Sequence, residues 1–570
     1  MATQKQEQGA SVFSVVFLYL DREGITVAVE KTEVVVIGGG ATGTGILRDL
    51  SMRGVKAILV EEHDLAHGTS SRFHGLLHSG ARYAVKDYEA AKECIDENKI
   101  MRKIGKGTCV EETEGLFVQL PGDDPAYADQ WIKACEKAGI TVKEIPVEKA
   151  LELEPNINPQ IQRAFIVPDA AVDGFRLVWA NVESAERYGG KAYTYNRLDE
   201  IITNEGKVTG VVVTDTVSSQ SREIECDYVI NACGAWAGKV AALAGVDIKV
   251  TADKGTLIAF NHRLTSRVVN RLRKPGDGDI IVPHGTVSIF GTTSVVVDSP
   301  DSLDSTTDEV KRLMHLGREM FSNLEEFRVL RSFAGVRPLY QDSSASSDEG
   351  DGRAVSRGFA LLDHKDQGVE GFVSIVGGKF TTYRLMAEKA TDLICKQMAN
   401  TKPCRTAKEE LIPAATATQI DELGKYTTNP AAYKTAERWG KNVDQVIEVI
   451  KTNPWKGDIV CECEQVTLAE VELRAKERAR VTLNDIRRKT RLGMGTCQGT
   501  ICTGRAITQL YEGGQLTHHE VKVMLDEFIE GRWKGNRNAM WGEQVRQVEF
   551  LRNRYMNLYN VNQGGDNYEI

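Results

Sequence analysis

The amino-acid sequence predicts an α/β protein with three parts: a discontinuous Rossmann-like domain, a mainly antiparallel domain inserted into it, and a small α-rich unit that carries a cysteine cluster. Three observations predict this fold. Residues 34–45, VVVIGGGATGTG, run an apolar strand into a glycine-rich turn and then into a helix. Residues 228–236 and 372–384 repeat the pattern of a strand followed by glycine. Four of the 11 cysteines gather near the C-terminus.

The first glycine-rich turn has the spacing of a dinucleotide site. Gly38, Gly40 and Gly43 form G-x-G-x-x-G, which allows a tight turn, close approach of a pyrophosphate, and close packing of helix on strand. A second apolar strand at 57–60 ends at Glu61, where a carboxylate can accept hydrogen bonds from ribose hydroxyls. The alternative is a glycine turn in an ordinary strand-helix pair. The residues assigned to the site are Gly38, Gly40, Ala41, Thr42, Gly43 and Glu61.

Composition and charge set outer limits. The 570 residues are 41% hydrophobic and 26% charged, which is typical of a globular protein with several domains. A net charge of -9 argues against a nucleic-acid partner. Seven cysteines are scattered singly, as in proteins of a reducing cytosol. The hydrophobic stretch at 11–20 is too short to span a bilayer, and it leaves open an added strand, a disordered extension or an upstream start.

Residues 68–83, GTSSRFHGLLHSGARY, lack a clear helical or strand period and are rich in small and hydrogen-bonding side chains. This composition suits a segment that lies along a ligand. We expect the first polar residues to reach a pyrophosphate, the next residues to line a flavin ring, and the last two to bind a phosphate or carboxylate. Each histidine alone is more often structural. In that order the residues are Thr69, Ser70, Ser71, Arg72, then His74, Leu76, His78, then Arg82 and Tyr83.

Two later strands also run into glycine. Residues 228–236 reach Gly234, and this block is expected to pass beneath the adenosine half of a dinucleotide. Residues 372–384 place a second helix N-terminus near the expected ring position. The alternating stretches at 210–214, around Val282 and at 288–297 are interpreted as one separate sheet. The residues assigned to the second turn are Gly378, Lys379, Phe380 and Thr381.

The cysteine cluster has the composition of an iron-sulfur site. Cys461 and Cys463 form C-x-C, 33 residues intervene, and Cys497 and Cys502 form C-x-x-x-x-C. Four thiolates from two short loops can ligate the irons of a [2Fe-2S] cluster, and the arrangement resembles the bacterioferritin-associated ferredoxin-like domain. Zinc and disulfides are the alternatives. The basic stretch at 484–491 would either raise the potential of the cluster or form an exposed helix face.

Longer blocks carry a family resemblance. GGGATGTGILRDLSMRG, HGLLHSGARY, GVRPL, SRG and GGKFTTYRLMAEKA resemble FAD-dependent glycerol-3-phosphate dehydrogenase over nearly all of residues 33–559. The C-terminal cysteines make the resemblance closest to the large catalytic subunit of the anaerobic, multi-subunit form. The resemblance implies FAD as electron acceptor, sn-glycerol 3-phosphate as donor, dihydroxyacetone phosphate as product, and electron delivery towards a membrane quinone.

The resemblance also implies a phosphate clamp. Arg337 and Arg357 match the clamp positions of the family, and Arg82, Tyr83 and Lys379 complete the assigned catalytic set. A guanidinium is a planar, permanently charged donor that suits a phosphate dianion, although ordinary ion pairs are the alternative for each arginine.

The general base is left open by the sequence. Aerobic relatives carry a histidine after K-G-S, whereas this chain has Leu257 at that place. His78, Lys379 or a water polarised by arginine are the candidates. The polar segment 342–352 between the two clamp arginines would be either a lid or a plain solvated loop.

The predicted organisation places an electron exit beside a substrate site. We expect partner subunits, an oligomer, and a peripheral location on the cytoplasmic face of the cell membrane, since no stretch suits a transmembrane helix. A soluble FAD oxidase with a structural metal site, and a non-enzymatic electron carrier, are the alternatives. The predicted parts are 1–31, an N-terminal extension; 32–400, the oxidoreductase, with FAD-binding pieces near 32–110, 200–240 and 360–400; 401–455, a linker with helices; 456–515, the [2Fe-2S] unit; and 516–570, a helical segment.

Overall fold

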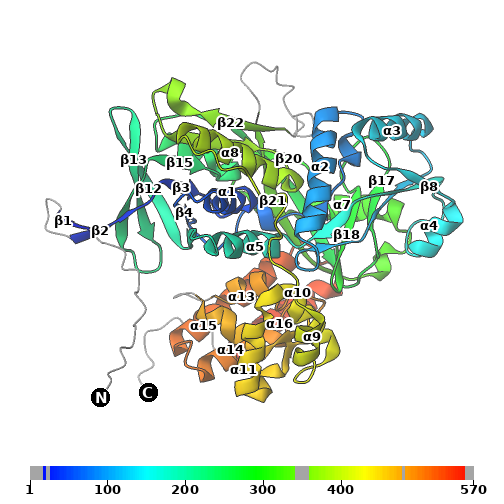
Figure 1. The fold of residues 1–570 in the computed structure, drawn as a ribbon. Coiled ribbons are helices and arrows are strands. Elements are labelled where there is room, and N and C mark those ends of the chain that lie inside the picture. The colour runs from blue at the N-terminus through cyan, green and yellow to red at the C-terminus, as the bar shows by residue number, and fades with distance from the viewer. Residues whose placement is uncertain (1–16, 21–25, 341–357, 478–481, 559–570) are drawn as a thin grey trace.

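The computed structural model describes residues 17–20, 26–340, 358–477 and 482–558. It has a large α/β body and a smaller helical lobe beneath it, drawn in yellow to red in Figure 1. The predicted fold class is confirmed. Arg357 and the polar segment 342–352 lie outside the described residues.

A six-stranded sheet forms the centre of the body. Its order is β11 (Lys191–Tyr193), β4 (Ala57–Val60), β3 (Val34–Ile37), β15 (Tyr228–Asn231), β23 (Phe372–Gly377) and β22 (Phe359–Asp363). Neighbouring strands are parallel except for β22, which runs antiparallel to β23. Strands from four distant parts of the chain therefore build one sheet, which confirms the discontinuous domain.

Both faces of this sheet are covered, as is usual for parallel strands. Val34 and Val36 pack on one side with helices α1 (Ala41–Met52), α5 (Gly174–Glu186) and α8 (Tyr383–Gln397). Val35 and Ile37 point to the other side, where they pack against a five-stranded sheet. That sheet has the order β1 (Phe17–Leu20), β2 (Thr26–Lys31), β14 (Ser221–Glu225), β13 (Lys207–Asp215) and β12 (Asn196–Asn204).

The described part of the N-terminal extension is therefore strand. β2 pairs with β14 in parallel, so that Glu30 lies beside Ile224. Of the three alternatives left open by the sequence, the added strand is the one that this segment adopts.

The inserted domain is built on a nine-stranded sheet, on the right in Figure 1. Its strands are β7 (Gly115–Gln119), β8 (Lys143–Ile145), β9 (Arg163–Val167), β16 (Val250–Phe260), β17 (Val268–Arg271), β18 (Ile280–His284), β19 (Val287–Gly291), β20 (Val295–Val297) and β21 (Val329–Tyr340). All pairs are antiparallel except β17 with β7. Helices α2 (Tyr88–Ile104), α3 (Pro125–Ala138), α4 (Val147–Leu153) and α7 (Thr307–Met320) surround it.

One detail of the predicted sheet is wrong. The stretch 210–214 lies in β13, whereas Val282 and 288–297 lie in the nine-stranded sheet. The two groups separate because Val211 and Val213 of β13 pack on the parallel sheet, while Val282 packs with Leu76 and Val268.

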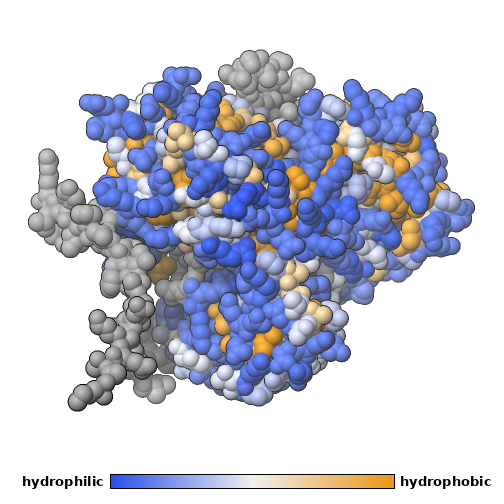
Figure 2. All heavy atoms as spheres, in the orientation of Figure 1, coloured by the Kyte–Doolittle hydropathy of each residue, from blue (hydrophilic) through white to orange (hydrophobic). Residues whose placement is uncertain are grey.

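The C-terminal lobe is almost entirely helical. Its helices are α9 (Ala417–Leu423), α10 (Asn429–Trp439), α11 (Asp444–Thr452), α12 (Leu468–Lys476), α13 (Leu483–Thr490), α14 (Cys502–Glu512), α15 (His518–Asn536) and α16 (Glu543–Leu558), with a short pair β24 (Ile459–Cys461) and β25 (Val466–Thr467). Figure 2 shows a largely hydrophilic face with scattered apolar side chains. Within the described ranges, every helix is too short or too polar to cross a bilayer.

Candidate active site

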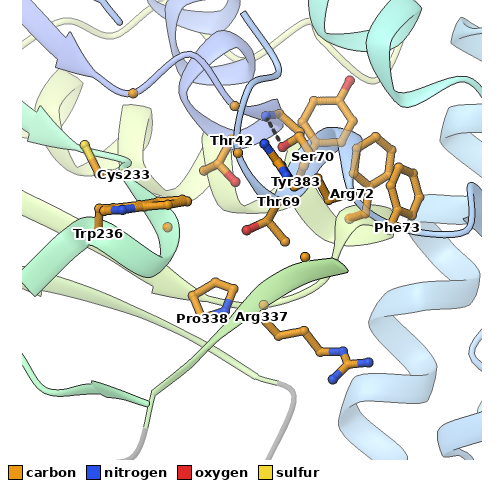
Figure 3. Close-up of a pocket in the computed structure, with 18 of the residues that line it drawn as sticks. Thr42, Thr69, Ser70, Arg72, Phe73, Cys233, Trp236, Arg337, Pro338 and Tyr383 are labelled. Carbon is orange, nitrogen blue, oxygen red and sulfur yellow. Dashed lines mark hydrogen bonds between the residues drawn. The ribbon is translucent and has the colours of Figure 1, made fainter. Parts of the chain in front are cut away.

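A cavity of about 930 Å³ lies where the parallel sheet meets the inserted domain. Its walls come from the turn after β3, the segment 67–83, the turn after β15, the antiparallel strands and the turn after β23. Figure 3 shows these segments around one opening, with Trp236 and Cys233 on one side and Arg337 below. Segments separated by up to 340 residues therefore line one site of a size common for cofactor pockets.

The glycine turn has the geometry that its spacing predicts. Gly38 has φ +109°, and a Cβ there would lie 2.7 Å from the carbonyl oxygen of Ala232. A Cβ on Gly43 would lie 1.9 Å from the carbonyl oxygen of Gly38, so Gly43 packs behind the turn and is not on the cavity wall. Gly40, Ala41 and Thr42 line the cavity at the start of α1. This places the positive end of a helix dipole at the opening.

Glu61 lies beside this turn. Its Oε2 accepts a hydrogen bond of 2.7 Å from the backbone N–H of Gly39, and its Oε1 accepts one of 3.0 Å from the backbone N–H of His63. Burial raises the pKa of Glu61, although these two N–H groups oppose the shift. The carboxylate is thus fixed at the edge of the cavity, in the position expected for a ribose partner.

The polar segment after Glu61 reaches the helix start. The Oγ of Ser70 accepts a hydrogen bond of 2.9 Å from the backbone N–H of Ala41, drawn as a dashed line in Figure 3. Thr69 donates to the carbonyl oxygen of Val336 at 2.6 Å, and Arg72 donates through Nε to that of His67. Ser71 does not line this cavity but faces a second one.

His74, Leu76 and His78 all line the cavity. Burial, together with nearby Arg337 and Arg82, lowers the pKa of His74 to about 3. Burial and Lys379 lower the pKa of His78 to about 3 as well, and its Nδ1 is buried without a hydrogen-bond partner. Both imidazoles are therefore neutral at physiological pH.

The two later turns complete the walls. Gly234 has φ +54° and open space where a Cβ would stand, and Gly378 lies on the opposite wall with φ +75°. Lys379 and Phe380 line the cavity, and the ring of Phe380 stacks on Phe73 with 4.4 Å between centroids. Thr381 is fully buried behind the wall, because the short helix Phe380–Thr382 turns it inward.

Two of the assigned arginines are held by buried carboxylates. Arg337 on β21 lies opposite Asp253 on β16, with 2.5 Å between Nη1 and Oδ2, and Nη2 donates to the carbonyl oxygen of Thr293 at 3.0 Å. Arg82 donates to Asp279 at 2.8 Å, and both aspartates have fully buried side chains. The sequence analysis missed both partners, because they lie 84 and 197 residues from their arginines.

Strand β16 explains the departure at Leu257. A Cβ on Gly255 would lie 2.3 Å from Nη2 of Arg337, so only glycine lets the strand pass the guanidinium. Lys254 pairs with Glu309 away from the cavity, and Leu257 is fully buried in the core. Tyr83 lines the cavity between His78, at 5.2 Å edge to face, and Lys379, whose Nζ lies 5.8 Å from the ring centroid.

Residues 33–384 match the family described as FAD dependent oxidoreductase. The chain belongs to this family. It is 42% identical to a subunit of the anaerobic glycerol-3-phosphate dehydrogenase of Haemophilus influenzae, over 93% of this chain and 94% of that protein. It is 41% identical to the subunit of the same name from Escherichia coli K12, over 93% and 97%. The predicted family resemblance is confirmed.

Solved structures agree on the fold. A glycerol-3-phosphate dehydrogenase from Bacillus halodurans, solved with FAD, superposes with a TM-score of 0.65 at 22% identity, over 90% of this chain and 96% of that one. A glycerophosphate oxidase from Mycoplasma pneumoniae, solved with FAD, gives 0.52 at 20% identity over 64% and 95%.

The cavity of this oxidoreductase fits an FAD molecule. A pyrophosphate finds the N-terminus of α1 and the glycine turn, a ribose finds Glu61, and Gly234 leaves open space. At the far end, the unpartnered Nδ1 of His78 and the side chain of Lys379 lie on the wall where a polar ring edge would reach.

The four C-terminal cysteines lie together in the helical lobe. The thiol of Cys502 contacts those of Cys461 and Cys497, and Cys497 also contacts Cys463. Hydrogen bonding from Cys502, aided by the N–H groups of Gly493 and Glu464, lowers the pKa of Cys461 to about 7. The same thiol and the N–H groups of Ile501 and Gly499 lower the pKa of Cys497 to about 5, while the pKa of Cys502 is raised.

This donor set fits an iron-sulfur cluster, because it combines four thiols with backbone N–H groups directed at sulfur. Gly499 supplies one of these N–H groups, to Cys497. Gly495 instead allows close packing, since a Cβ there would lie 2.3 Å from that of Cys463. Among the described residues, no set of three or more His, Cys, Asp or Glu side chains is arranged around a single metal position.

The basic stretch that precedes the second cysteine pair is not an exposed face. Arg488 pairs with Asp64, Arg491 pairs with Asp173 at 2.9 Å, and Lys489 lies 3.8 Å from the ring centroid of Trp179. Asp173 and Trp179 belong to the start and middle of α5. Helix α13 therefore fixes the helical lobe to the FAD-binding body.

Proposed function

We propose that the chain oxidises sn-glycerol 3-phosphate to dihydroxyacetone phosphate, with FAD as the hydride acceptor. Electrons then leave one at a time through a [2Fe-2S] cluster on Cys461, Cys463, Cys497 and Cys502, towards a membrane quinone or a partner subunit. The observation that carries the proposal is one cavity lined by both the dinucleotide turn and Arg337 of the antiparallel sheet. The names of relatives at 41–42% identity support the same substrate.

FAD would lie along the glycine turn, Glu61, Ser70 and Gly234, with its ring near His74, His78 and Lys379. The bound flavin supplies two-electron acceptance from a carbon-hydrogen bond. The chain supplies orientation, exclusion of water and charge around the substrate. The stacked rings of Phe73 and Phe380 keep one wall of the cavity apolar.

A phosphate group would bind Arg337 and Arg82, assisted by Tyr83 and Lys379. Asp253 and Asp279 orient the two guanidinium groups before substrate arrives, so less conformational entropy is lost on binding. Arg357 is proposed as a further clamp residue from the family pattern alone. Because His78 is neutral and buried, its free nitrogen is able to accept the hydroxyl proton of the substrate.

The cluster would accept electrons singly at the helical lobe, which α13 holds against α5. Delivery to a membrane quinone requires a second protein, and we propose that this is a partner subunit of the same complex, bound to the cytoplasmic face. Oligomeric assembly through such subunits is part of the same proposal.

Anaerobic titration of the full chain with sn-glycerol 3-phosphate tests the substrate and the electron path together. We expect bleaching of flavin absorbance, two irons and two acid-labile sulfides per chain, and a paramagnetic signal from the reduced cluster. Unchanged flavin absorbance would refute the substrate. Zinc in place of iron, with rapid oxygen consumption, would identify an oxidase with a structural metal site.

A further inference from the structure

A second cavity, of about 430 Å³, lies where three parts of the molecule meet. One wall is the back of the segment 71–75, the second is the antiparallel sheet around Arg331, and the third is formed by α13 and α15 of the helical lobe. Arg72 and Phe73 line both cavities. Gln498, next to Cys497, also lines the second cavity. This cavity therefore lies between the dinucleotide site and the cysteines.

Its walls carry buried arginines that no carboxylate neutralises within the described part of the chain. The Nε atoms of Arg331 and Arg487 are buried without a hydrogen-bond partner. Arg487 donates from Nη1 to the neutral amide oxygen of Asn484 at 3.2 Å, and Arg72 donates to a backbone carbonyl oxygen. Three guanidinium charges thus surround one cavity.

The carboxylates on the same walls pair with other cations. Asp173 binds Arg491 at 2.9 Å, and Asp304 binds Lys534 at 2.5 Å. The groups that act on the pKa of Arg331 are burial, Arg72 and Arg532, and together they lower it to about 10. Burial and neighbouring arginines lower the pKa of Arg487 to about 10 as well. Such mutual repulsion stores an electrostatic cost that a bound anion would remove.

The remaining walls are apolar and partly aromatic. The residues are Phe73, Phe175, Ile289, Phe333, Met494 and Phe528. A site with several guanidinium groups beside aromatic rings suits a ligand with a multiply charged head and a compact organic body.

We propose that this cavity is a second ligand site, which binds a small organic oxyanion with two or more charges, either a phosphate ester or a polycarboxylate. Its charged head lies between Arg331, Arg487 and Arg72. Because these arginines come from the inserted domain, the helical lobe and the FAD-binding segment, the anion ties the three parts together. The proposal is independent of the reaction in the first cavity.

Calorimetric titration of the full chain tests the site, with phenyl phosphate and citrate as the two probes. We expect one bound anion per chain, with affinity about tenfold or more weaker in Arg331→Met and in Arg487→Met, since each loses a charge-assisted contact. Arg546→Met changes an exposed side chain on α16 and is the matched control. Which probe binds more tightly distinguishes the phosphate from the carboxylate class.

Arg337→Ala separates the two cavities. Binding that survives this change but is lost in Arg331→Met assigns the anion to the second cavity, and the reverse pattern overturns the proposal. Affinity unchanged in both second-cavity variants, or heat of binding for neither probe, overturns it as well. Both variants should fold, because each removes a buried charge, and an anion-free melting temperature at or above that of the wild type checks this.

Discussion

The arginines of the two adjacent cavities differ in their partners. In the first cavity, Arg82 and Arg337 each hold a fully buried aspartate. In the second, Arg331 and Arg487 have buried Nε atoms without an acceptor. The same side chain is therefore a pre-positioned donor in one place and an uncompensated charge in the other.

Because of this contrast, the sign of a mutational effect depends on the partner. Removing one member of a buried pair leaves the other charge without compensation, which is costly. Replacing an uncompensated buried charge by an apolar side chain relieves the protein of that cost. Four substitutions, in decreasing order of effect, test the comparison.

The largest effect is expected for Asp279→Asn. Arg82 and Arg273 both bind this carboxylate, so its loss should lower the free energy of unfolding by about 3 kcal/mol. Burial alone would raise the pKa of Asp279, but the two arginines outweigh burial and hold the pKa below 3.8. The stabilisation is therefore full above that pH and is lost as the pH falls through the native pKa.

Urea denaturation at neutral pH and near pH 3 measures this difference. Asp129→Asn is the control, because Asp129 is a 68% exposed partner of Arg163 and should change stability by less than about 1 kcal/mol. Equal losses in both variants would contradict the distinction between buried and exposed pairs.

Arg337→Lys should have the next largest effect. Lysine lacks the planar fork that reaches Asp253 and a phosphate at once, so KM for sn-glycerol 3-phosphate should rise about thirtyfold, which is about 2 kcal/mol. Turnover of glycerol, which has no phosphate, should change little. Steady-state kinetics with both substrates decide the matter, with Arg312→Lys at a 63% exposed side chain as the control. Parallel losses on both substrates would remove the clamp.

Arg331→Met should have the opposite sign. In anion-free buffer we expect the free energy of unfolding to rise by about 1 kcal/mol, because an uncompensated charge leaves the interior. Arg488→Met is the matched change on the same cavity wall, and it should destabilise because Asp64 loses its partner. Chemical denaturation of both variants gives the two signs directly, and destabilisation by both would break the comparison.

His78→Gln should have the smallest effect, visible only in the dependence on pH. Burial holds the native pKa of His78 near 3, whereas the unfolded chain takes up a proton near 6.5. Stability is therefore lost as the pH falls below 6.5, by about 1 kcal/mol per pH unit for this histidine. Denaturation midpoints at pH 6.5 and about pH 5.5 should differ less in the variant than in the wild type. His519→Gln is the surface control, and a variant with the wild-type slope would refute the buried neutral histidine.

Sequence predicts best what is local. The G-x-G-x-x-G spacing determines a turn within six residues, and the structure places Gly38, Gly40 and Gly43 as that turn requires. Alternation of side chains also identifies 210–214 and 288–297 as strands. It carries no information on which sheet each strand joins, because that depends on partners such as Val35 and Leu76.

Long-range pairing is the part that sequence does not reveal. Asp253 and Asp279 do not stand out in the chain, yet they decide what Arg337 and Arg82 can do. The basic stretch at 484–491 has the composition of an exposed helix face, and only its contacts with Asp64, Asp173 and Trp179 show that it is an interface. Ser71 and Thr381 show the same limit, because a short helix turns each away from the first cavity.

The attachment of α13 to α5 has a kinetic consequence. Arg491 on Asp173 and Lys489 over Trp179 hold the cysteine-bearing lobe in one orientation beside the flavin-binding body. A lobe that had to swing in order to collect electrons would slow down in glycerol or sucrose solutions. Here the internal electron transfer that we propose should proceed at a rate independent of solvent viscosity.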